Sequence, residues 1–120
     1  MIVTNNNKVY EELRNDYNIY YKECSFRDVL VYVRDKVHEG HTLLTHPLSS
    51  SIKPNETPYK SILISDKKNN LDNDSLLIIE NAILSFDKFA KDANHMIKLT
   101  DKIRDDFKFV DLSIIKSALR

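Results

Sequence analysis

The feature that most constrains this chain is a helix signal with both ends marked, between Ser25 and Gly40. The Ser25 hydroxyl can cap the first turn, and Asp28 complements the positive end of the helix dipole. Gly40 is the only glycine in the chain and a typical left-handed helix stop, because no Cβ opposes a positive φ. We therefore predict a helix that ends at Glu39. Its apolar face would be formed by side chains at helical spacing, which are Phe26, Val29, Leu30, Val33 and Val37.

Short apolar runs alternate with further helical patterns along the rest of the chain. The runs at 1–4, 18–22, 41–45 and 60–65 predict strands. Helices are predicted at 9–14 and 76–90, and the second of these is apolar over more than half its circumference, which indicates a place in the core. Met96, Leu99 and Ile103 suggest another helical stretch, and Asp111 can cap a final helix. Tyr20, Tyr21 and Tyr32 are interpreted as core and strand residues.

This order of elements predicts one small layered α/β domain over residues 1–120, with a mainly parallel, roughly four-stranded sheet flanked by helices. In such sheets ligands bind at the carboxyl ends of the strands, where loops and helix N-termini meet. The end of the first strand (Thr4, Asn5, Asn6) should then lie close to the end of the third (Thr45, His46).

Composition excludes several classes of partner and compartment. With 42% hydrophobic and 30% charged residues, a chain of 120 residues can form a core without help. Lys plus Arg and Asp plus Glu both number 18, so no net field attracts nucleic acid or an anionic membrane. Cys24 is the only cysteine, and the start MIVTNNN lacks the pattern of a signal peptide. No apolar run approaches the roughly 20 residues of a membrane span, so we expect a cytoplasmic protein.

The polar segment 38–60 is the part of the sequence that most resembles a functional site. It contains three histidines, three consecutive serines and all three prolines of the chain. Ordering so long a loop costs entropy, which makes such loops uncommon without a function. Its hydroxyls, amides and lysine suit a small polar or anionic ligand, although serines and asparagines also serve simply to satisfy turns. The residues predicted to bind it are Asn5, Asn6, His41, His46, Ser49, Ser51, Lys53, Asn55 and Thr57.

Other chemistries are weaker in this segment, and we predict neither a metal nor a cofactor. The histidines His38, His41 and His46 are the only metal candidates, but a helix stop separates the first two. His46 is the one candidate general base. Ser50 and Lys53 match S-x-x-K formally, but Pro54 spoils the helical context that the motif needs. Outside the segment, Cys24 is interpreted as buried filler and His95 as solvent-facing.

The run GH-x-L-L-x-HPL-x-x-S-x-KPNETPYKS, together with the opening MIVTNN, resembles the GrdX family of small proteins over most of the chain. The resemblance implies a genetic setting beside glycine reductase genes in anaerobic bacteria that ferment amino acids, and it supplies no catalytic residues to transfer. Three functions follow as hypotheses. The chain binds a small ligand as an accessory protein, it helps assemble glycine reductase components, or it is a small enzyme with His46 as base.

Overall fold

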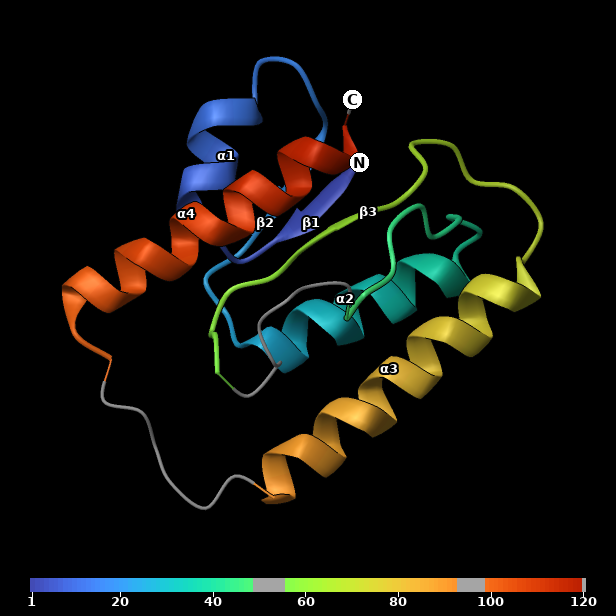
Figure 1. Ribbon diagram of the computed structural model, residues 1–120. Helices are drawn as coiled ribbons and strands as arrows, with labels where there is room; N and C mark the ends of the chain where they lie inside the picture. The colour runs from blue at the N-terminus through green and yellow to red at the C-terminus, as the bar shows by residue number, and fades with distance from the viewer. Residues whose placement is uncertain (49–55, 93–98, 120) are drawn as a thin grey trace.

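A three-stranded mixed sheet lies between two pairs of helices in the computed structural model, which describes residues 1–48, 56–92 and 99–119 (Figure 1). The predicted α/β class is confirmed, whereas the predicted four-stranded, mainly parallel sheet is wrong. In chain order the elements are β1 (Ile2–Thr4), α1 (Asn7–Leu13), β2 (Ile19–Tyr21), α2 (Phe26–His38), β3 (Ser61–Leu63), α3 (Asn73–Asp92) and α4 (Asp101–Ala118).

The central strand β1 decides which side chains enter which layer. It pairs in parallel with β2, where Ile2 lies opposite Ile19, and antiparallel with β3, where Thr4 lies opposite Ser61. Because successive side chains of a strand point to opposite faces, Ile2 and Val3 enter different cores. Helices α1 and α4 cover the Ile2 face, and α2 with α3 covers the Val3 face (Figure 1).

Helix α2 has the boundaries that its sequence predicts. The Ser25 hydroxyl accepts from the Asp28 amide at 3.0 Å, and the Glu39 backbone caps the other end. Gly40 follows with φ +112°, and a Cβ at this position would lie 2.1 Å from the Asn69 carbonyl oxygen. The glycine is therefore required both by its backbone conformation and by the close approach of a second chain segment.

The predicted strand at 41–45 is wrong, because only one isolated bridge forms there, between Leu43 and Ile64. Backbone bonds such as that from the Leu44 amide to the Leu63 carbonyl oxygen do form, but side-chain hydroxyls take the place of others that a regular ladder would make. The Leu43 amide donates to Ser75 Oγ at 2.9 Å, and Thr45 Oγ1 accepts from the Leu63 amide at 3.0 Å. The segment is apolar enough for a strand, but side-chain partners compete for its backbone.

The long connection 41–60 begins near the amino end of β1 and ends near its carboxyl end. At its start the His41 ring lies 2.7 Å from the Ser65 carbonyl oxygen, just after β3. At its end the Pro58 carbonyl oxygen lies 2.7 Å from the Asn5 side chain, just after β1. Because the chain crosses the molecule here, β3 enters the sheet antiparallel to β1.

The two C-terminal helices also differ from the prediction. Helix α3 does not lie inside the core, since Leu77 and Leu84 are 62% and 67% exposed. Helix α4 begins after Thr100, whose hydroxyl accepts from the Ile103 amide. Asp111, predicted as a cap, instead lies buried inside this helix. The predictions for His95 and Met96 fall outside the described residues.

No helix within the described ranges has the length and apolar character needed to cross a bilayer.

A buried polar cluster joins β1, β3 and α4. Asp111 Oδ1 accepts from the Ser61 amide at 3.0 Å, and Oδ2 accepts from the Ser61 hydroxyl at 2.7 Å and from Asn6 Nδ2 at 3.0 Å. Since the Ser61 proton is committed to Asp111, the Thr4 hydroxyl must donate to Ser61 Oγ, 2.7 Å away. Burial raises the pKa of Asp111, against the lowering effect of these donors and of the Lys60 charge.

We expect this raised pKa to give stability a pH dependence that Asp111→Asn removes. An acid whose folded pKa exceeds its unfolded value contributes stability that is complete below about pH 3.9 and is lost as pH rises through the folded pKa. The free energy of unfolding, native minus Asp111→Asn, should therefore fall with rising pH, by at most about 1.4 kcal/mol per pH unit. Urea denaturation from about pH 4 to about pH 8 measures this difference, and a rise with pH would contradict it.

Candidate functional site

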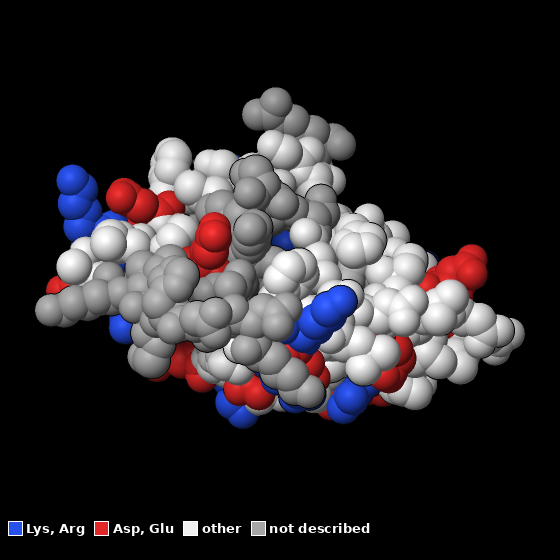
Figure 2. Space-filling view, turned by 60° about the horizontal axis from the view of Figure 1, so that its bottom comes forward, with Lys and Arg blue, Asp and Glu red and all other residues white. Residues whose placement is uncertain are grey.

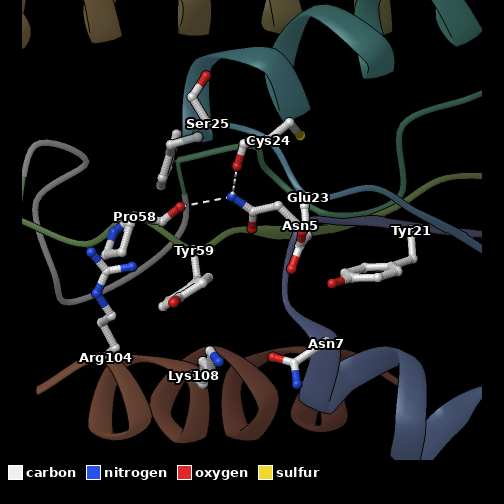
Figure 3. A pocket seen from close by; sticks show the side chains of 11 residues that line it. Asn5, Asn7, Tyr21, Glu23, Cys24, Ser25, Pro58, Tyr59, Arg104 and Lys108 are labelled. Atoms are coloured by element: carbon white, nitrogen blue, oxygen red, sulfur yellow. Dashed lines mark hydrogen bonds between the residues drawn. The ribbon is translucent and has the colours of Figure 1, made fainter. Parts of the chain in front are cut away.

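A pocket of about 330 Å³ opens at the carboxyl ends of the two parallel strands (Figure 3). It lies where β1 leads into α1 and β2 leads into α2, and these two helices cover opposite faces of the sheet. Such a divergence leaves a crevice between the strand ends, which is where open α/β sheets bind ligands. The lining residues are Asn5, Asn7, Tyr21, Glu23, Cys24, Ser25, Phe26, Pro58, Tyr59, Arg104 and Lys108.

Asn5 shapes this pocket by joining three chain segments. Its Nδ2 donates to the carbonyl oxygens of Cys24 at 2.9 Å and Pro58 at 2.7 Å, as Figure 3 shows, and its Oδ1 accepts from the Lys60 amide at 2.9 Å. Both amide protons and one oxygen lone pair are thereby engaged. The Asn5 side chain is a fixed part of the wall, and it holds the end of the 41–60 segment against the chain that enters α2.

Asn6 is a structural residue. It is fully buried, and its Oδ1 accepts from the Lys8 amide as the cap of α1. Its Nδ2 donates to the Lys108 carbonyl oxygen at 2.9 Å and to Asp111 at 3.0 Å. Asn6 therefore fixes α4 to the end of β1, and it is absent from the lining of the pocket.

Two cations on successive turns of α4 form one wall. Arg104 and Lys108 rise from the helix toward the pocket in Figure 3, and Lys108 Nζ lies 5.5 Å from the centre of the Tyr59 ring. Among the described residues, neither side chain forms an ion pair. Both cations are therefore available to a ligand.

The opposite wall carries an acidic group beside an aromatic ring. Glu23 directs its carboxylate toward the α4 side of the pocket (Figure 3), and Tyr21 stacks on Tyr10 with ring centres 5.3 Å apart. Burial raises the pKa of Tyr21, and the Glu23 charge adds to this effect. The Tyr21 hydroxyl therefore stays protonated and can act as a hydrogen-bond donor.

Cys24 contributes its backbone rather than its thiol. Its carbonyl oxygen accepts from Asn5, while the sulfur points away from the Asn5 amide in Figure 3. Burial, followed by the charge of Asp28, raises the pKa of the thiol. A raised thiol pKa lowers the fraction of nucleophilic thiolate, so this cysteine has no sign of activation.

His46 lies in a different pocket, of about 360 Å³, on the far side of Ser61 and Lys60. The walls of this second pocket also include Thr45 and the apolar side chains of Ile114 and Ile115. His46 Nδ1 accepts from the Leu48 amide at 3.1 Å, which places the proton of a neutral ring on Nε2. To act as a base, the ring would have to give up this hydrogen bond.

Of the other predicted site residues, those that the structure describes line neither pocket. His41 is 2% exposed and bonds the Ser65 carbonyl oxygen, His38 is exposed and lies 4.0 Å from Glu80, and Thr57 accepts from the Tyr59 amide in a turn. No cluster of three His, Cys, Asp or Glu side chains within the described ranges could hold a metal ion. Ser49, Ser50, Ser51, Lys53, Pro54 and Asn55 lie outside the described residues.

The charged walls of the first pocket were not predicted from the sequence. Arg104 and Lys108 lie before Asp111, the residue predicted to cap the final helix, whereas α4 begins after Thr100. Thr100 and Asp101 form a capping signal that could have indicated this earlier start. Tyr21 was predicted as a core and strand residue, with no role in a pocket. Helix α4 is held at this end of the strands by tertiary contacts, such as the hydrogen bond from Asn6 Nδ2 to the Lys108 carbonyl oxygen.

The architecture is that of a small three-layer α/β domain with a pocket at a strand-end crevice. The model of the GrdX-like protein family matches residues 1–120, so this chain belongs to that family, as the sequence resemblance indicated. Searches of curated proteins and of solved structures returned no match.

Replacement of Asn5 by alanine should destabilise the fold. The Cys24 and Pro58 carbonyls and the Lys60 amide would lose their partner in a partly buried place, so we expect a loss of about 2–4 kcal/mol in the free energy of unfolding. Asn7→Ala is the matched control, because within the described ranges the Asn7 side chain makes a single hydrogen bond, an exposed 3.3 Å contact with Glu11. Equal effects of both substitutions in urea denaturation would contradict the structural role of Asn5.

Proposed function

We propose that this protein binds a small anionic ligand in the pocket at the carboxyl ends of β1 and β2. The observation that carries the proposal is the pair of cations, Arg104 and Lys108, which line a pocket and have no ion-pair partner in the described part of the chain. A guanidinium group can hold a carboxylate or phosphate through two parallel hydrogen bonds, and the lysine adds a point charge.

The position of the pocket in the fold supports this proposal. The ends of two adjacent parallel strands meet there, and the first turn of α2 begins at Ser25 on its wall. Amides at the start of a helix favour negative charge nearby. The helix alone would be weak support, but it acts in the same direction as the two α4 cations.

The proposed pocket includes part of the site that the sequence predicted. Asn5 belongs to the pocket, and the 41–60 segment contributes its last residues, Pro58 and Tyr59, to the wall. His46 and Thr45 line the second pocket instead. Ligand-binding roles for Ser49, Ser51, Lys53 and Asn55 stay predictions.

Substitutions on α4 test the proposal directly. Arg104→Gln and Lys108→Gln should each weaken binding of phosphate or butanoate about tenfold, since each removes a charge that faces the ligand. Lys102→Gln is the matched control, because this exposed lysine on the same helix lines neither pocket. Isothermal titration calorimetry at low ionic strength measures the dissociation constants. Binding that is absent in the native chain, or equally weakened by all three substitutions, would refute the site.

A second candidate function, docking to a protein partner, is favoured by the exposed apolar side chains of α3. Leu77 and Leu84 lie two turns apart and are 62% and 67% exposed. In Figure 2, which brings the α3 side forward, a broad described area lacks charged side chains. Large apolar side chains that stay exposed are candidates for interaction sites. The partners implied by the family resemblance are glycine reductase components.

Co-purification separates docking from ligand binding. If α3 docks a reductase component, tagged protein should retain that component without any added small molecule, and Leu77→Gln or Leu84→Gln should reduce retention at least about fivefold. Leu71→Gln provides a control at an exposed leucine outside α3. Retention that survives both α3 substitutions would exclude this helix as the docking surface.

A further inference from the structure

The pocket contains charges of both signs that remain apart. Arg104 and Lys108 stand on the α4 wall and Glu23 on the opposite one, and within the described ranges Glu23 also forms no ion pair. Elsewhere on the surface opposite charges meet directly, as in the 2.8 Å contacts of Arg27 with Asp87 and Lys116 with Glu12. Within the described part of the chain, the pocket therefore carries unpaired charges of both signs on its walls.

The layout gives the pocket a cationic side and an anionic side. On the cationic side, Lys108 Nζ lies over the Tyr59 ring at 5.5 Å from its centre. On the other side, the Glu23 carboxylate points into the space between the walls, near the Tyr21 ring (Figure 3). A carboxylate beside an aromatic ring attracts a cation both by charge and through the face of the ring.

We propose that the ligand is a small zwitterion, with its anionic group held by Arg104 and Lys108 and a protonated amine held by Glu23. This inference rests on the proposed function and adds the ligand class. A ligand with only negative charge would satisfy the α4 cations but leave Glu23 unpaired and repelled. A zwitterion complements both walls at once, and a volume of about 330 Å³ limits it to a small molecule.

The α4 cations and Glu23 have effects on affinity that can be measured separately. The cations set whether any anion binds, whereas Glu23 sets the advantage of an added ammonium group and weakens binding of a simple anion. Glu23 is exposed and partly screened by water, so this advantage should be moderate, about three- to tenfold in affinity. Because Glu23 makes no described hydrogen bond, Glu23→Gln should leave the fold intact.

Two matched pairs of ligands test the inference by isothermal titration calorimetry at neutral pH and low ionic strength. The pairs are propanoate with alanine, and butanoate with 4-aminobutanoate, and in each pair the second member adds only an ammonium group. We expect the ammonium-bearing member of at least one pair to bind about three- to tenfold tighter than its partner. Glu23→Gln should abolish this preference, and because it removes a charge that repels the carboxylate it should also raise the affinity for the simple carboxylate. Asp16→Asn removes an exposed carboxylate outside the pocket and should change neither value.

The outcomes distinguish failure of the zwitterion inference from failure of the proposed anion binding. If the carboxylates bind and lose affinity in Arg104→Gln, but neither pair shows a preference for the ammonium form, the anion site stands and the zwitterion is excluded. A preference that persists in Glu23→Gln would also overturn the inference, because the ammonium group would then be recognised elsewhere. If no compound of either pair binds to the native chain, both the inference and the proposed carboxylate site fall.

Discussion

The fold depends on a buried set of hydrogen bonds at the carboxyl end of β1. Asn5 joins the strand to the chain entering α2 and to the segment entering β3, while Asn6 joins it to Asp111 and the backbone of α4. Without these bonds, buried amides and carbonyls in three segments would lack partners, each at a cost of about 1–3 kcal/mol. The same bonds place Lys108 and its neighbours at the strand ends. One polar cluster therefore both stabilises the layers and forms the pocket.

The sequence predicted correctly those elements whose ends are set by single residues. Helix α2 was predictable from Ser25 and Gly40, because a cap and a positive φ are properties of single residues. The strand at 41–45 was not, because the Ser75 hydroxyl meets the Leu43 amide, and the Thr45 hydroxyl meets the Leu63 amide, only after the chain has folded. The direction of β3 was equally hidden, since it depends on where the two ends of the 41–60 connection meet the sheet.

The sequence indicated only one part of the candidate site, because Asn5 lines the pocket whereas Thr45 and His46, expected beside it, line the second pocket. The rule that ligands bind at strand ends indicated Asn5, which does line the pocket. It could not show that hydrogen bonds to Cys24 and Pro58 already occupy the Asn5 amide. The cations of α4 come from a region nearly 100 residues away in the chain, and their place depends on Asn6 and Lys108 packing together. The histidines of 41–60 favoured a functional role for this segment, yet the His41 ring hydrogen-bonds the Ser65 carbonyl oxygen.

Backbone amide chemical shifts can locate the anion site, which we propose between α4 and the strand ends. We expect titration of isotope-labelled protein with butanoate to shift the amides of residues 23–26, 58–59 and 104–108 in a saturable way. Shifts confined to residues 43–48 and 114–118 would place the ligand in the His46 pocket and contradict the account.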